Sequence, residues 1–175
     1  MTTTDTTKNT ERISDPIHRV SYTFKREGEN MWVDTWFEDG AHLPEHFHPA
    51  SEERWAAVDG TLRVRLDGEW RDLRPEDGYV TVRPNVRHAL KNESGRTVQG
   101  RTECIPALHL EEFLTESARA AREGLYNKYN LPTGWRGAVW AADFSRRFRD
   151  ETVVTSPPPA VQRIFSAMLA RFARD

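Results

Sequence analysis

The sequence predicts a mainly β fold, a sandwich or small barrel, followed by a small α-helical extension. Short β-prone segments punctuated by turns fill residues 17–108, with no helical pattern between them. After Pro106 the apolar residues change to a helical spacing. We therefore divide the 175-residue chain into a disordered tail over residues 1–16, a β-barrel domain over 17–108 and a helical extension over 109–175.

The tail over residues 1–16 is rich in threonine, poor in apolar residues, and ends at Pro16. Such a segment buries too little apolar surface to offset the entropy lost on folding, so we expect it to be disordered. It also lacks the apolar stretch of a secretory signal.

The β domain is expected to contain several short strands. Residues 31–37 are β-prone and precede a Glu-Asp-Gly turn. Residues 61–66 alternate between apolar and other side chains, which predicts one buried and one exposed face. Asp67 and Gly68 follow as a hairpin turn. Further strands are predicted over residues 79–82 and 97–105.

The extension is expected to contain three helices. In the first, apolar and small side chains recur at helical spacing from Leu110 to Ala121, and Gly124 is a stop signal. Residues 137–148 form a second candidate. The clearest apolar stripe runs over residues 161–172, and we expect it to pack on the barrel or on a second subunit.

Composition excludes several classes of partner. The net charge is −2 with 30% charged residues, so we expect no electrostatic binding to nucleic acid or to an anionic membrane. No apolar run approaches the roughly 20 residues that span a bilayer. The single cysteine, Cys104, excludes an internal disulfide framework and fits a reducing compartment. We therefore expect a cytoplasmic protein.

Two glycine-bounded segments carry the residues that point to chemistry. The first reads Gly40-x5-His46-x-His48-x4-Glu53-x6-Gly60, and the second reads Gly78-x5-Pro84-x3-His88-x3-Asn92. Residues two apart in a strand point to the same side, so His46 and His48 are both expected to face the barrel interior. Three imidazoles and one carboxylate can hold a divalent metal with coordination positions left open, and they suit Fe(II), Mn(II), Co(II), Ni(II), Cu(II) or Zn(II).

These segments resemble the paired motifs of the cupin superfamily, G-x5-H-x-H-x3,4-E-x6-G and G-x5-P-x-G-x2-H-x3-N. The first motif is matched at every defined position; the second lacks its inner glycine, and its proline-to-histidine gap is one residue shorter. The resemblance covers about residues 17–108 and implies a double-stranded β-helix, or jelly roll, that often dimerises. It assigns the metal-ligand role to His46, His48, Glu53 and His88, with Glu52 as the alternative carboxylate.

Several other residues are candidates for proton transfer or for the pocket. His42 lies four residues before His46, and an unbroken strand would put it on the same inner face, although Pro44 interrupts the register. We name Glu53, His42 and Tyr79 as candidate catalytic residues. Trp55 is a candidate for lining the substrate cavity, and Cys104 is interpreted as a buried small hydrophobe.

The leading functional hypothesis is a mononuclear, metal-dependent enzyme, with Fe(II) favoured, that acts as a dioxygenase on a small organic molecule. A second hypothesis keeps the metal as a Lewis acid for isomerisation, cyclisation, epimerisation or lyase chemistry, with His42, Tyr79 or Glu52 as general base. A third is a non-catalytic barrel that binds a small molecule. A homodimer is expected in each case.

Overall fold

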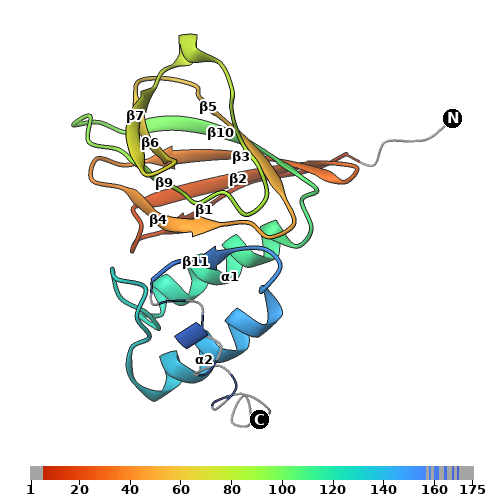
Figure 1. Cartoon of the computed structure of the whole chain (residues 1–175), viewed down its shortest axis with the longest axis vertical. Coiled ribbons are helices and arrows are strands. Elements are labelled where there is room, and N and C mark those ends of the chain that lie inside the picture. The colour runs from red at the N-terminus through yellow and green to blue at the C-terminus, as the bar shows by residue number, and fades with distance from the viewer. Residues whose placement is uncertain are drawn as a thin grey trace, which may run out of the picture.

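The computed structural model describes residues 6–156 and, beyond them, residues 158, 160, 161, 164, 167 and 169. Two antiparallel sheets form a barrel, and two helices lie below it (Figure 1). The predicted jelly roll with helices in its C-terminal part is confirmed.

Sheet A has six strands and sheet B has five. In spatial order, sheet A contains β1 (Thr6–Asp15), β2 (Val20–Glu27), β3 (Asn30–Phe37), β10 (Val98–Ile105), β5 (Glu52–Ala57) and β8 (Val80–Val82). Sheet B contains β11 (Val153–Val154), β4 (His42–Phe47), β9 (His88–Lys91), β6 (Leu62–Leu66) and β7 (Glu69–Leu73). A single 3-10 turn, η1 (Pro75–Asp77), is the one short helix within the described barrel.

The alternation along each strand decides which side chains fill the barrel. Along β3, Met31, Val33 and Phe37 are buried, whereas Trp32 and Trp36 are only partly covered. The two tryptophans therefore face outward. The inward residues of both sheets form one apolar core. Its most fully buried members are Phe37, Met31, Leu62, Leu73, Leu90, Val64 and Val98.

The predicted hairpin at Asp67 and Gly68 is confirmed. Leu66 pairs with Glu69, so the loop between β6 and β7 has two residues. Both have positive φ, 52° at Asp67 and 84° at Gly68. This is the conformation of a type I′ turn, whose twist matches that of the flanking strands.

The prediction of a disordered tail over residues 1–16 is wrong for the part that the structure describes. Thr6–Asp15 forms β1, which pairs with β2 at the edge of sheet A. An edge strand is held by backbone hydrogen bonds, so it forms without a continuous apolar face. Ile13 packs against the core, and the Arg12 guanidinium lies 3.6 Å from the Trp36 ring.

The extension is helical only in part. Helices α1 (Leu110–Arg122) and α2 (Gly134–Arg147) confirm the first two predicted helices. After α2 the chain returns to the barrel, and β11 pairs with β4. Of the third predicted stripe, Phe165, Met168 and Phe172 lie outside the described residues, and Ile164 is exposed.

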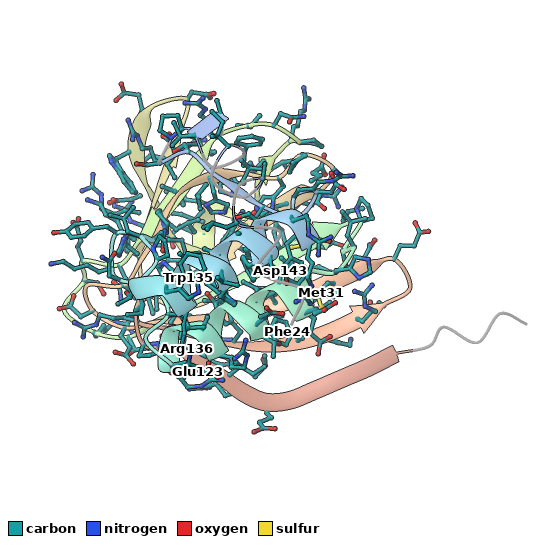
Figure 2. The ribbon with its side chains drawn as sticks, turned by 90° about the horizontal axis from the view of Figure 1, so that it is seen from below. Phe24, Met31, Glu123, Trp135, Arg136 and Asp143 are labelled. Atoms are coloured by element: carbon teal, nitrogen blue, oxygen red, sulfur yellow. The ribbon has the colours of Figure 1, made fainter. Side chains whose placement is uncertain are left out.

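The helices lie below the barrel, on the side where β1 and β4 lie (Figure 1), and in the view from below they lie in front of it (Figure 2). A buried polar cluster joins them to the barrel. The Asp15 carboxylate accepts hydrogen bonds from His18 Nδ1 (2.8 Å) and from the Tyr126 hydroxyl (3.1 Å). His18 Nε2 lies 3.0 Å from the Asn130 amide oxygen. Sequence spacing gave no signal for this cluster, because Tyr126 and Asn130 lie more than a hundred residues from Asp15 and His18.

Within the described ranges, no helix is long and apolar enough to cross a bilayer.

We expect Asp15→Asn to lower the free energy of unfolding at pH 7 by about 1.5–3 kcal/mol, the range for buried hydrogen bonds to a charged group. Burial raises the pKa of Asp15, but the hydrogen bonds and charge of His18 outweigh it and hold the pKa below 3.8. The stabilisation is therefore present above the ordinary pKa and is lost as the pH falls through the lowered folded-state pKa.

Urea unfolding of the wild type and of Asp15→Asn between pH 7 and pH 3 checks this expectation. The difference between the two proteins should be largest at pH 7 and should shrink in acid. Asp72→Asn, at an exposed carboxylate, is the matched control. Equal stability of all three proteins at pH 7 would contradict the assigned role.

Candidate metal centre

A bulge in β4 sets the direction of the first two candidate ligands. Leu43 pairs with Leu90 and His46 with His88, so three steps on β4 match two steps on β9. Both Leu43 and His46 consequently face the barrel interior, and His48 follows at the end of the strand. The bulge occurs at Pro44, which has no backbone N–H and so interrupts the hydrogen bonding between β4 and β9.

Two strands supply the remaining candidate ligands. Glu53 lies on β5 and pairs with Cys104 of β10, with its side chain buried on the inner face of sheet A. His88 is the first residue of β9 and is 1% exposed. The barrel therefore brings a carboxylate from one sheet against histidines from the other.

The four predicted ligands meet in one buried cluster, with one potential ligand atom from each residue and all of these atoms within 4.8 Å of one another. The Glu53 oxygens lie 3.3 Å from His48 Nε2 and 3.2 Å from His88 Nε2. The ring centroids of His46 and His88 are 4.2 Å apart.

The outer nitrogens of the three histidines fix the direction of the inner ones. His46 Nδ1 donates to the Pro44 carbonyl at 2.7 Å, and His88 Nδ1 donates to the Val86 carbonyl at 3.0 Å. His48 Nδ1 donates to the Glu151 carbonyl at 2.6 Å. A carbonyl only accepts, so each Nδ1 carries the hydrogen and each Nε2 has a free lone pair.

The cluster fits a divalent metal ion. His48 Nε2 and His88 Nε2 are buried without a hydrogen-bond partner, an arrangement that is costly unless a ligand completes it. Two ligand atoms about 2.0–2.2 Å from one metal and at a right angle would lie about 3 Å apart, close to the separations seen here. The neighbouring Glu52 is not part of this cluster: its carboxylate is ion-paired with the exposed Arg54 at 3.1 Å.

The electrostatics of the cluster keep Glu53 ionised and His46 neutral. Burial lowers the pKa of His48, but the Glu53 charge outweighs burial and raises it above its ordinary value. Burial lowers the pKa of His46 well below its ordinary value, which keeps that imidazole neutral. Burial raises the pKa of Glu53, but the adjacent imidazoles of His48 and His88 outweigh this effect and hold the pKa of Glu53 well below 4.5. Trp55 Nε1 donates to the same carboxylate at 2.7 Å, so Glu53 is a fixed anion.

Cys104 lies beside Glu53 and is a thiol rather than a thiolate. Burial and the Glu53 charge raise the pKa of Cys104 well above its ordinary value. Its Sγ–H points to the carboxylate at 3.5 Å. The interpretation of Cys104 as a small buried residue is confirmed.

The turn before His88 forms without the glycine that the second motif would place there. Val86 N–H donates to the Arg83 carbonyl, which closes a turn with Pro84 and Asn85 at its centre. Asn85 takes a φ of 66°, the left-handed conformation that asparagine tolerates better than most residues. Asn92, the last motif residue, is fully buried and its amide donates to three backbone carbonyls.

Two candidate catalytic residues are not brought to the cluster. His42 precedes the inward Leu43, so it faces away from the interior, and its ring contacts His18 at 5.8 Å between centroids. The expectation that His42 shares a face with His46 fails because of the bulge. Tyr79 is 54% exposed and lies against Trp32 on the outer face of sheet A, 6.5 Å between ring centroids.

The segment after α2 returns to the barrel and contacts two of the candidate ligands. This contact was not predicted from the sequence. Val154 of β11 pairs with His46, and the Glu151 carbonyl accepts from His48. The buried Glu151 carboxylate accepts from the backbone N–H of His109 at 2.8 Å, just before α1. The one signal in the sequence was the short β-branched run over residues 152–155.

The cluster opens into a large cavity of about 1090 Å³. Barrel residues, including Trp55 and Thr102, line one side, and α1 and α2 line the other with aromatic side chains. Trp55 therefore lines the cavity, as the sequence predicted.

Comparison with known families agrees with the fold and the site. Residues 36–99, which contain all four candidate ligands, match the family model of the cupin domain. The chain belongs to the cupin superfamily. A cupin of the RmlC-like type from Shewanella frigidimarina has a similar fold, with 24% identity and a TM-score of 0.51 over 59% of this chain and 89% of that chain.

Two curated relatives match this cupin over short segments. An oxidoreductase from Arthrobotrys oligospora is 37% identical over 57 residues, which are 33% of this chain and 22% of the relative. The polyketide synthase CurC from Streptomyces cyaneus is 42% identical over 53 residues, which are 30% of this chain and 34% of the relative. The matches thus span about a third or less of the relatives' length.

We expect the purified cupin to bind one divalent ion per chain, and His46→Ala or His88→Ala to abolish stoichiometric binding. Each substitution removes a ligand from a closed cluster. Elemental analysis and calorimetric titration with Zn(II) measure the effect. His42→Ala is the matched control, since its side chain faces away; equal loss in the control would contradict the ligand assignment.

A second expectation concerns the return segment. Glu151→Ala removes the acceptor that anchors this segment to the start of α1, and we expect about tenfold weaker Zn(II) binding, as is common for groups that orient metal ligands. Glu151→Gln keeps an acceptor oxygen and should bind Zn(II) like the wild type. Calorimetry on the three proteins decides, and unchanged binding in Glu151→Ala would refute the coupling.

Proposed function

We propose that this cupin is a mononuclear metal-dependent dioxygenase, with Fe(II) as the resident metal, that acts on a small organic molecule. The observation that carries the proposal is the buried cluster of three histidines and one carboxylate at the wall of a large, mostly apolar cavity. A bound Fe(II) would supply open coordination positions at which a chelating substrate and O2 meet.

The chain's own residues prepare that site. His46, His48 and His88 present their Nε2 atoms to the site, and a backbone carbonyl holds each ring in one orientation. Glu53 supplies one negative charge and is held in place by the Trp55 indole. Preorganised ligands need little rearrangement when a metal or substrate binds.

Among the described residues of the cavity, we identify no unpaired general base near the candidate ligands, and this favours oxygen chemistry over the Lewis-acid alternative. Among the described residues, His42 and Tyr79 point elsewhere, and Cys104 has a raised pKa. Asp15 and His18 line the cavity but are bonded to each other and to residues of the extension. Isomerase or lyase chemistry needs a base within hydrogen-bond reach of the substrate.

The mainly apolar walls of the cavity suit an organic substrate. Aromatic rings from the helices and from β5 surround it, and the barrel closes it on the other side. Such walls exclude water from the reacting groups. The relative from Arthrobotrys oligospora is an oxidoreductase by name, which also favours redox chemistry.

Oxygen consumption tests this proposal. We expect the Fe(II)-loaded cupin to consume O2 only in the presence of an organic substrate, and His48→Ala to lose this activity by at least about 100-fold, because a ligand is missing. An oxygen electrode, with product analysis by mass spectrometry, gives the readout. Turnover that persists without O2 would favour the Lewis-acid alternative, and ligand binding without any turnover would favour a binding barrel.

A further inference from the structure

The helical side of the cavity is a continuous wall of aromatic rings. Tyr126 stacks on Trp140 of α2, with ring centroids 5.6 Å apart and an interplanar angle of 13°. Trp140 lies 4.8 Å from Phe144, which lies 4.9 Å from Phe148. All four rings line the cavity. One or two such rings would be ordinary core packing, but this wall borders about 1090 Å³ of space.

The barrel side of the same cavity also presents aromatic faces. Trp55 of β5 lines it, and its ring lies 6.5 Å from His88, so it borders the metal ligands. Tyr22 of β2, the strand between β1 and β3 in sheet A, also lines it. Flat rings on both sides favour a flat ring system between them, because aromatic groups gain from stacked and edge contacts beyond simple burial.

Apart from the histidine nitrogens of the candidate metal centre, two buried polar atoms of the described cavity walls have no hydrogen-bond partner. Thr102 Oγ1 is one; the residue is 3% exposed and sits beside Trp55 on the inner face of sheet A. Trp140 Nε1 is the other, on the helical side. Buried polar atoms are nearly always paired, so these two mark places for polar groups of a ligand. The indole can only donate, whereas the hydroxyl can donate or accept.

The charged side chains around the cavity are already paired among the described residues. Arg146 binds Asp143 at 2.8 Å, and Arg149 approaches Asp150 at 3.5 Å. Such paired groups leave little to neutralise an acidic ligand, for example a sugar phosphate. The cavity therefore suits an uncharged molecule.

We propose that the substrate is an uncharged, planar, multi-ring molecule that carries hydrogen-bonding oxygens. Its rings lie between Trp55 and the aromatic wall of α2, one carbonyl or hydroxyl oxygen accepts from Trp140 Nε1, and a second polar group pairs with Thr102 Oγ1. The cavity volume stands at the upper end of the roughly 300–1,000 Å³ of ligand pockets, enough for several fused or linked rings. This inference rests on the proposed function, since it names the substrate class of the same site.

Calorimetric titration with flavone, a planar ring ketone that is uncharged, tests the proposal on the zinc-loaded and metal-free protein. We expect one flavone per chain. Trp140→Phe keeps the ring and removes the donor, and Thr102→Val keeps the shape and removes the hydroxyl. Each should weaken binding roughly 3- to 10-fold, the contribution of one hydrogen bond.

Two matched controls sit outside the cavity. Trp135→Phe lies on α2 at a residue that is 58% exposed (Figure 2), and Thr81→Val lies on an exposed position of β8. Both should bind flavone like the wild type. Circular dichroism of every variant separates a lost contact from a lost fold.

The ligand series separates the possible failures. Decan-2-one, a flexible ketone, should bind at least about tenfold more weakly than flavone, and glucose should not bind. Equal binding of flavone and decan-2-one, or unchanged binding in both cavity variants, would overturn the substrate class. If the protein takes up one Zn(II) but does not bind flavone, the substrate class is also overturned, whereas the proposal of a metal-dependent enzyme is unaffected. Flavone binding without any metal uptake would instead refute the proposed function.

Discussion

Three hydrogen bonds from histidine Nδ1 atoms to backbone carbonyls hold the whole candidate metal centre in its working geometry. Without them the imidazoles of His46, His48 and His88 could rotate or change tautomer, and the Nε2 atoms would not converge. The buried Glu53 anion would then lose the groups that offset its desolvation. Burial of three imidazoles in an apolar barrel costs less free energy because each Nδ1 atom donates to a backbone carbonyl.

These three bonds differ in how far they reach, and that difference explains what the sequence could predict. His46 and His88 each bond to the residue two positions earlier, so motif spacing carries the information. His48 bonds to Glu151, which is 103 residues away. No local pattern reveals a partner at that distance. The clustering of the four candidate ligands was therefore predictable from the sequence, and the segment that orients one of them was not.

The other differences between sequence and structure have similar local or long-range causes. The strands and the hairpin turn followed from alternation and from Asp67-Gly68, which are short-range features. The direction of His42 depended on a bulge, and one extra residue reverses every side chain beyond it. The tail became β1 because backbone pairing with β2 needs no apolar pattern. Composition alone underestimates such edge strands.

The barrel and the extension contribute different parts of the site, and residues 148–155 connect them. The barrel contributes the four ligands, and the extension contributes most of the aromatic wall. Phe148, the end of that wall, accepts a backbone hydrogen bond from Glu151, whose own carbonyl orients His48. A substitution that displaces the wall near Phe148 therefore also displaces the acceptor of a metal ligand. In this cupin, the shape of the cavity and the geometry of the candidate ligands are linked through residues 148–155, so changes in the extension are expected to act on the candidate metal centre.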